Sequence, residues 1–139
     1  SGTQILGYDI DAWTFGGDYD ALGRLNYRTS LARTLAEYKG RFTTNYQVGD
    51  INARWVVNYL HDYTYNDQDG TDGTVDSHVT HDVHVNYSLM DGQLELIASA
   101  INLGDEDPPF MSREMNYDAL SHSAFGRILR VGFQYNMGQ

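Results

Sequence analysis

Two stretches near the end of the chain decide its fold: QLELIASAIN at residues 93–102 and GRILRVGFQYNM at residues 126–137. In both, apolar and polar side chains alternate, which is the period of a β-strand with different surroundings on its two faces. A long polar segment, residues 103–124, joins them. The second stretch ends almost at the last residue, and its aromatic and glycine residues indicate the closing strand of a larger sheet.

The composition favours strands throughout. The 139 residues suit one domain, and 11 Tyr, 5 Phe and 2 Trp stand beside 14 Gly and only 2 Pro. No run of about 18 apolar residues is present, so we expect no transmembrane helix. The mean hydropathy of −0.50 is compatible with a membrane β-barrel, because the strands of such a barrel turn alternate polar residues inward.

Charge and motif content exclude several classes of function. Nine basic against 19 acidic residues give a net charge of −10, which repels phosphate backbones, so we expect no nucleic-acid partner. No cysteine is present, so disulfide and thiol chemistry are excluded. No nucleophile elbow, phosphate loop or metalloprotease motif occurs, and we expect neither an enzyme nor a cofactor. The chain lacks a signal-peptide pattern and starts within a strand, which indicates a processed precursor or a piece of something longer.

Alternation predicts seven strands, at residues 4–15, 20–35, 41–48, 51–65, 77–90, 93–102 and 125–137. The apolar faces of the fourth and fifth strands are the clearest, and consist of Ile51, Ala53, Trp55, Val57, Tyr59 and Tyr63, and of Val79, Val83, Val85, Tyr87 and Leu89. Tight connections at 16–19, 49–50 and 91–92 alternate with longer polar ones at 36–40, 66–76 and 103–124. This asymmetry is typical of outer-membrane barrels. We therefore predict one all-β unit over residues 1–139, an antiparallel up-and-down meander of about seven strands that forms part of a large outer-membrane β-barrel.

Several motifs resemble the C-terminus of TonB-dependent outer-membrane receptors. They are Asn102-Leu103-Gly104-Asp105 followed by Pro108-Pro109, Gly126-Arg127, and the VGFQYNM stretch at 131–137. Leu6-Gly7-Tyr8-Asp9-Ile10 also looks like that family's Gly-x-Asp strand. Gly104 stands where the family usually has an aromatic residue, and Met137 replaces its terminal aromatic. The resemblance marks Gly132, Phe133, Tyr135 and Met137 as candidates for the signal that the barrel-assembly machinery reads.

This resemblance implies a barrel of about 22 strands with a plugged lumen, which takes up a nutrient across the cell outer membrane. The implied partners are outer-membrane lipid and lipopolysaccharide, the rest of the barrel with its plug, and a TonB-type energy coupler that binds the N-terminal part. Seven strands cannot close such a barrel. In isolation the fragment would have two open edges, and we expect it to self-associate.

Charged residues on the polar faces are candidates for the lumen wall: Asp9, Asp11, Arg24, Arg28, Arg54, Asp82, Glu95 and Arg130. They would contact plug or substrate, or else form a ladder of opposite charges between neighbouring strands. Arg33 and Arg127 fall on the outward face near the long-loop end. There they would either bind lipopolysaccharide phosphates or remain solvated.

Two weaker patterns suggest metal ligands. In the Asp-rich segment 66–76, the candidates for calcium are Asp67, Asp69 and Asp72. An EF-hand begun at Asp67 would have Thr71 as its third ligand and Asp72 at the glycine position, so a solvated loop fits better. His78 and His84 share a face with Asp82, whereas His81 lies on the other, and no third element completes a metal site.

Two other interpretations of the chain remain open. One is an autonomous β fragment that assembles through its open strand edges into an oligomer or filament. The other is a soluble acidic β-sandwich whose Asp-rich loop binds calcium or carbohydrate.

Overall fold

The computed structural model describes residues 2–4, 9–10, 19–25, 34–66, 72–112 and 115–137. These residues form twelve strands and no helix, and thus no helix long and apolar enough to cross a membrane. The strands are β1 (Gly2–Gln4), β2 (Asp9–Ile10), β3 (Tyr19–Asp20), β4 (Arg24–Leu25), β5 (Thr34–Leu35), β6 (Tyr38–Val48), β7 (Ile51–Leu60), β8 (Tyr63–Asn66), β9 (Asp72–Val75), β10 (His78–Leu89), β11 (Leu94–Ile101) and β12 (Ile128–Tyr135).

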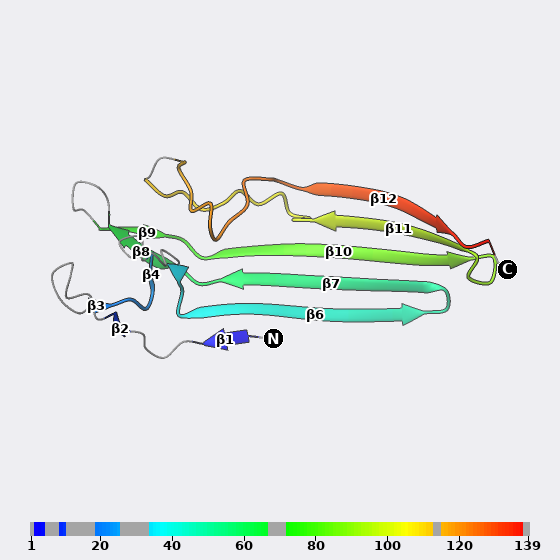
Figure 1. Cartoon of the computed structure of the whole chain (residues 1–139), viewed down its shortest axis with the longest axis horizontal. Coiled ribbons are helices and arrows are strands. Elements are labelled where there is room, and N and C mark those ends of the chain that lie inside the picture. The colour runs from blue at the N-terminus through cyan, green and yellow to red at the C-terminus, as the bar shows by residue number, and fades with distance from the viewer. Residues whose placement is uncertain are drawn as a thin grey trace.

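Six of these strands form one antiparallel sheet in the order β1-β6-β7-β10-β11-β12, here called the main sheet (Figure 1). The prediction of an all-β fold is confirmed, and the main sheet is antiparallel as predicted, whereas a second, smaller sheet contains one parallel pair. β6, β7 and β10 are 11, 10 and 12 residues long, which is about twice the usual strand length in globular proteins. The main sheet is open: β1 and β12 form its two edges, and no closed barrel exists among the described residues.

The register of the main sheet places the apolar side chains of neighbouring strands on one face and their polar side chains on the other. Residues opposite each other in a ladder share a face, and one row runs from Tyr46 through Ala53, Val85 and Ala98 to Val131. The same register gathers an apolar face, which consists of Phe42, Tyr46, Val48, Ile51, Trp55, Val57, Tyr59, Val79, Val83, Val85, Tyr87, Leu89, Leu94, Leu96, Leu129, Val131, Phe133 and Tyr135 with the alanines between them. The predicted apolar faces of the fourth and fifth strands are confirmed, except at Tyr63.

Most of the apolar face is uncovered. Val131 is 89% exposed and Phe133 76%, and even Trp55 in the middle of the sheet is 44% exposed. One histidine lies on this face, His81, and its ring stacks on Trp55 at a centroid distance of 5.7 Å. The opposite, polar face carries rows such as Asn45, Arg54, His84, Ser99 and Arg130. The sheet therefore separates an apolar surface from a polar one.

Two tight turns close the hairpins at one end of the main sheet. At the first, Val48 pairs with Ile51, and Gly49 has a φ of +54°, a conformation that glycine adopts without strain. At the second, Met90, Asp91 and Gly92 all have positive φ. The strands consequently end at Leu89 and restart at Leu94, so the connection is one residue longer on each side than the predicted two-residue turn at 91–92.

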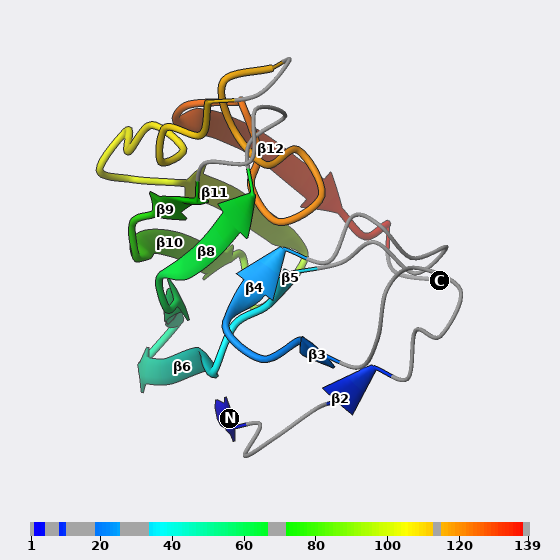
Figure 2. The same cartoon turned by 90° about the vertical axis from the view of Figure 1, so that its left-hand side faces the viewer.

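A second, four-stranded sheet lies at the opposite, long-loop end, in the order β5-β4-β8-β9 with β4 parallel to β8 (Figure 1). The buried apolar cluster lies here and consists of Leu25, Tyr63, Tyr65, Val75 and Met111, with Leu60 packed against it. When the molecule is seen from this end, the main sheet is curved, and segment 115–126 lies on its inner side (Figure 2). The core of the chain is thus beneath the long loops and not against the apolar face.

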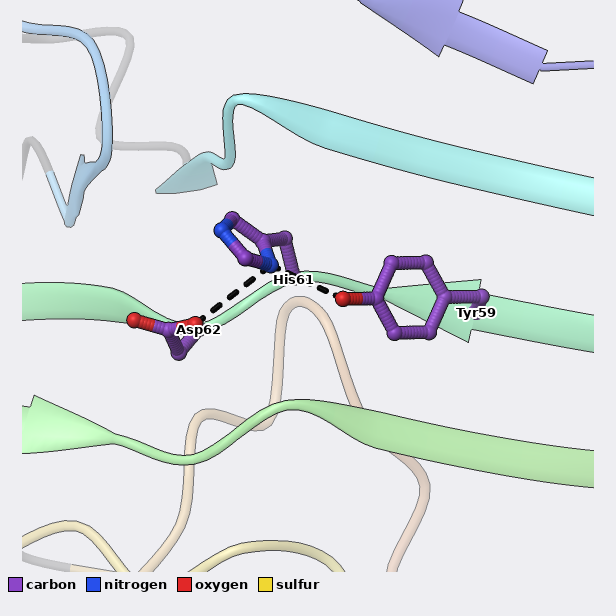
Figure 3. Close-up of polar contacts among 3 residues, drawn as sticks. All are labelled: Tyr59, His61 and Asp62. Carbon is purple, nitrogen blue, oxygen red and sulfur yellow. Dashed lines mark hydrogen bonds and ion pairs between the residues drawn. The ribbon is translucent and has the colours of Figure 1, made fainter.

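The predicted fourth strand, 51–65, breaks at His61 and Asp62. The His61 amide donates to the Tyr38 carbonyl at 3.0 Å, and its ring Nδ1 lies 2.8 Å from Tyr59 Oη and 3.4 Å from Asp62 Oδ1 (Figure 3). Beyond this point the chain leaves β7 for the second sheet, where Tyr63 pairs with Val75 and is 1% exposed. The prediction that Tyr63 shares the face of Trp55 was wrong, because the pairing partner changes after Leu60.

The N-terminal predictions also need correction. Residues 4–15 and 20–35 were expected as two long strands, but the described residues there form only strands of two or three residues. Gly23 has a φ of +67°, and its amide donates to the Leu35 carbonyl, so the chain turns where the second strand should continue. Residues 5–8, 11–18 and 26–33 lie outside the described part. In the segment 66–76, expected as a loop, β9 pairs with β8.

The sequence motifs at the two ends of segment 102–127 contact each other. Asn102 has a φ of +51°, and its side chain bonds both the amide and the carbonyl of Glu106 at 3.0 and 2.9 Å. Asp105 Oδ1 then accepts a hydrogen bond from the Arg127 amide at 2.6 Å. The segment therefore leaves β11 and enters β12 through one shared clasp, formed by Asn102, Asp105 and Arg127.

Replacing Gly126 with alanine should open this clasp. A Cβ at residue 126 would lie 2.5 Å from Asp105 Oδ1, so the carboxylate must move away and lose the Arg127 amide, at a cost of about 1 kcal/mol. Gly132→Ala is the matched control, because a Cβ there meets nothing within 4 Å. Urea unfolding of both variants measures the difference. Equal free energies of unfolding for the two would show that the clasp contributes no stability.

Candidate functional site

A cavity of about 490 Å³ lies between the polar face of the main sheet, at its long-loop end, and residues 121–126 above it. Its floor comes from β6, β7 and β10, its roof from Ser121, His122 and Ser123, and one side from Ile101 and Ile128. The volume falls within the range of about 300–1,000 Å³ that is usual for small-molecule sites. This cavity is the candidate functional site.

The ladder register fixes the floor of the cavity. Lys39, Leu60 and His78 form its first row across β6, β7 and β10. In the next row, the Asn58 amide nitrogen lies 3.3 Å from Thr80 Oγ1 and donates to Asp82 Oδ2 at 3.0 Å. Floor side chains therefore hold one another in place across strands, and their positions follow from backbone pairing.

Asp118 anchors the roof. It is 3% exposed and accepts hydrogen bonds from the Thr34 hydroxyl at 2.6 Å, the Tyr63 hydroxyl at 2.9 Å and the Leu120 amide at 3.0 Å. Its own carbonyl accepts from the amides of Ser121 and His122 at 3.2 and 2.9 Å. A buried carboxylate is costly without such partners. Here it joins the roof to β5 and to β8.

The hydrogen bonds of Asp118 outweigh its burial. Burial by itself raises the pKa of this carboxyl group, but hydrogen bonds from Thr34, Ser121, Tyr63 and the Leu120 amide together hold the pKa below its usual value. For Tyr63, burial first and the negative charge of Asp118 second raise the pKa far above the ordinary value of a phenol. Tyr63 therefore keeps its proton and donates it to an ionised Asp118.

His122 lies between Tyr63 and His78. Its ring stacks on Tyr63 at a centroid distance of 6.3 Å and stands perpendicular to His78 at 5.0 Å. Its Nε2 lies 3.3 Å from Tyr63 Oη. Because the only hydroxyl proton of Tyr63 goes to Asp118, Nε2 is assigned as the donor, and Nδ1 remains an acceptor. Burial, followed by the charges of His78 and Lys39, lowers the pKa of His122 although Asp118 opposes this, so the ring is neutral at pH 7.

Four predicted lumen residues lie on the polar face as expected from their positions: Arg54, Asp82, Glu95 and Arg130. Arg54 Nε donates to the Asn45 side chain at 2.9 Å, and Glu95 accepts from the Asn86 side chain at 2.9 Å. Asp82, the only one of the four that lines the cavity, accepts from Asn58 and from the Asn102 amide. Arg54, Asp82 and Glu95 thus form hydrogen bonds with neutral amide groups. These bonds differ from the alternative expectation, a ladder of opposite charges between neighbouring strands.

The other predicted site residues are dispersed. Arg24 is exposed in β4 of the second sheet and not in a long strand, and Asp9 lies in β2 opposite Asp20. Asp11, Arg28 and Arg33 fall outside the described residues. Arg127 is exposed, and its guanidinium contacts the Leu103 carbonyl. Of the assembly-signal candidates, Phe133 and Tyr135 lie on the apolar face, Gly132 lies on the polar face, and Met137 follows β12 with 83% exposure.

The metal predictions find no support among the residues that can be described. Asp72 lies in β9 and accepts a hydrogen bond from the Asn66 side chain, while Asp67 and Asp69 are outside the described part. His78, Asp82 and His84 share a face. No group of three or more possible metal-ligating side chains is assembled in the described part of the chain.

Sequence reasoning missed Lys39, Asp118 and His122. Asp118 has one local signal, since an Asp whose side chain and carbonyl bond the next few amides is typical of a turn. No alternation rule brings residue 118 next to residues 34 and 63, because the contact depends on how a long loop packs.

Comparison of the chain with known proteins finds no matching family model, no similar curated protein and no similar solved structure. The features that bear on function are therefore the two faces of the main sheet and the cavity.

Acidification should destabilise the roof. The pKa of His122 is lower in the folded chain than its unfolded value of about 6.5, so the unfolded chain binds more protons below that pH. The stabilising contribution is complete above about pH 6.5 and is lost as the pH falls toward the folded pKa, by at most about 1.4 kcal/mol per pH unit. Asp118, whose pKa is also lowered, should lose its own contribution only in a second step, below the ordinary Asp pKa of about 3.9.

Urea-unfolding free energies at pH 7.5, 6.5 and 5.5 measure the first step. His122→Gln should make the profile less steep over this range, and the remaining slope is expected from His78, whose pKa burial also lowers. His84→Gln, a change on the same polar face but away from the cavity, should leave it unchanged. A profile that is equally steep without His122 contradicts this assignment.

Proposed function

We propose that this chain is a wall segment of a TonB-dependent transporter in the outer membrane, which takes part in energised uptake of a nutrient. The observation that carries the proposal is the uncovered apolar face. Across β6, β7, β10, β11 and β12 it is continuous and largely exposed. A monomeric soluble protein rarely exposes so large an apolar surface. Lipid acyl chains would cover it.

The height of the apolar face fits a bilayer. From Val79 to Leu89, β10 makes ten residue steps, which span about 33 Å along the strand. Strands of outer-membrane barrels tilt by about 35–45°, so this length gives a band about 25 Å high, equal to the apolar band of such barrels.

Aromatic side chains lie toward both ends of this band. Tyr59 lies beside Gly40 and Val79 near the long-loop end, and Tyr46, Tyr87 and Tyr135 lie near the tight turns. Aromatic girdles at the two membrane interfaces have this arrangement. Trp55 and Phe42, whose rings meet edge-on at 6.4 Å, lie between the two groups and would contact acyl chains.

The other features agree with the same role. The tight turns at Gly49 and at residues 90–93 lie at one end, and the long connections 61–77 and 102–127 at the other, as in barrels with short periplasmic turns and long extracellular loops. The polar face would line the lumen and meet the plug. The energy coupler would bind a part of the protein N-terminal to this chain.

The open edges of the main sheet favour one second candidate, a fragment that assembles with copies of itself. Among the described residues, β12 pairs only with β11, and β1 covers no more of β6 than Tyr38 to Gly40. Such edges accept further strands. A soluble β-sandwich is less well supported, because the second sheet packs around Tyr63 and does not lie against the apolar face.

Quenching of Trp55 tests the membrane proposal. The variant Trp13→Phe leaves Trp55 as the sole tryptophan, and in bilayers of phosphatidylcholine brominated on the acyl chains its fluorescence should fall by more than half, whereas aqueous iodide should have little effect. The reason is that Trp55 lies in the middle of the apolar face. Strong quenching by iodide, in an oligomer that forms without lipid, would favour the self-assembling fragment.

A pair of arginine substitutions on β12 gives a second test. Val131 and Gln134 are both exposed but lie on opposite faces, so in water neither change should matter. In a bilayer, Val131→Arg should reduce the free energy of folding by about 2–4 kcal/mol, the cost of a lipid-facing arginine near the midplane. Gln134→Arg should cost less than about 1 kcal/mol. Folding titrations in urea with phospholipid vesicles measure both, and equal costs would refute a lipid-facing Val131.

A further inference from the structure

We infer that the cavity under residues 121–126 binds an elongated organic anion, with its charged group at Lys39 and its apolar end against Ile101 and Ile128. Binding there goes beyond the proposed transport role and does not depend on it, because the cavity lies on the polar face, whereas lipid would cover the apolar face.

Lys39 supplies the cationic end. It is the only lysine of the chain, and it lines the cavity from β6 in one row with Leu60 and His78. No carboxylate of the described residues forms an ion pair with it. Arg41, two residues along the same strand, also lines the cavity.

The acidic groups nearby keep their negative charges, but each has partners other than Lys39 among the described residues. Both oxygens of Asp82 are occupied, by the Asn58 side chain and by the Asn102 amide. Asp118 is buried and bonded to Thr34, Tyr63 and Leu120. Glu106 lines a second cavity, which has His78 in common with this one. The exposed ammonium group of Lys39 is therefore open to an anionic ligand group.

The opposite side of the cavity is apolar. Ile101 and Ile128 pair across β11 and β12 and turn toward the polar face, where they interrupt its polar character. β6 and β11 are three strand spacings apart, or about 14 Å. A compact anion such as phosphate cannot reach both ends, whereas an aryl or alkyl carboxylate with an extended apolar part can.

Neutral polar groups lie between the two ends. Asn58 uses its amide hydrogens on Thr80 and Asp82, so its carbonyl oxygen remains an acceptor, and the Thr80 hydroxyl keeps its own hydrogen to donate. These groups would bond a polar atom in the middle of the ligand. Most ligand sites combine an apolar lining with a few oriented polar groups in this way.

The single lysine makes a direct test possible. Reductive ¹³C-methylation of the full chain, folded in zwitterionic detergent, keeps the charge of Lys39 and gives a side-chain NMR signal that is identified by its loss in Lys39→Gln. The probes are 4′-fluorobiphenyl-4-carboxylate and, as its neutral match, the corresponding primary amide. The carboxylate should shift the Lys39 signal in a saturable way, and the amide should not.

Variants separate the two ends of the site. Lys39→Gln should weaken carboxylate binding, measured by ¹⁹F relaxation of the probe, by about tenfold. Arg130→Gln removes the same charge from the same face but outside the cavity, and should change the affinity less than twofold. Ile101→Asn should weaken the biphenyl acid more than it weakens benzoate. The inference is wrong if the Lys39 signal does not respond, if the amide shifts it equally, or if Arg130→Gln weakens binding as much as Lys39→Gln.

Discussion

The structure depends on a register that stays in phase across five strands. Because the side-chain period of a strand is two, a slip of one residue in any ladder would move that strand's apolar side chains to the polar face. The turn at Gly49 and the three positive-φ residues from Met90 to Gly92 fix two of the ladders. The β7–β10 and β11–β12 ladders keep the same phase across the long connections. The result is one continuous apolar surface.

An apolar surface of this kind has to be removed from water. Burial of apolar area is worth about 25 cal/mol per Å², and the described chain does not cover the area by itself, since its buried cluster lies at the long-loop end around Tyr63 and Val75. This arrangement is reasonable for a wall in lipid, where the surrounding acyl chains replace the second layer of a soluble sandwich. The loops outside the bilayer are surrounded by water and need a buried apolar core of their own. The cluster around Tyr63 and Val75, together with the hydrogen bonds of Asp118, supplies this core.

The sequence predicted the strands that face lipid in the proposed role better than the rest. β10, β11 and β12 follow from alternation to within a few residues at both ends, and β7 at its start, because each has an apolar face and a polar face. The break at His61 was not predictable in this way. Val57, Tyr59 and Tyr63 keep the same period through it, and only the change of pairing partner from Lys39 and His78 to Val75 reveals that the strand has ended.

The candidate site was missed for a related reason. Alternation assigns residues to faces, and it placed Arg54, Asp82, Glu95 and Arg130 on the polar face. It gives no information on where a long loop returns to the sheet. That position is set by specific pairs, Asp105 with Arg127 at the base and Asp118 with Thr34 and Tyr63 at the tip, and these contacts link residues up to 84 positions apart.

The same pairs hold the roof of the cavity in place without any ligand. The roof is held at its base by the clasp and at its tip by Asp118, and neither contact uses Lys39, Ile101 or Ile128. The cavity is thus formed before any ligand arrives, and binding need not provide the free energy of ordering a loop. Protonation of His122 would act on the roof and also on the cationic floor, because the charges of Lys39 and His122 influence each other. Roof stability and ligand affinity are therefore linked through His122, which lines the cavity together with Lys39.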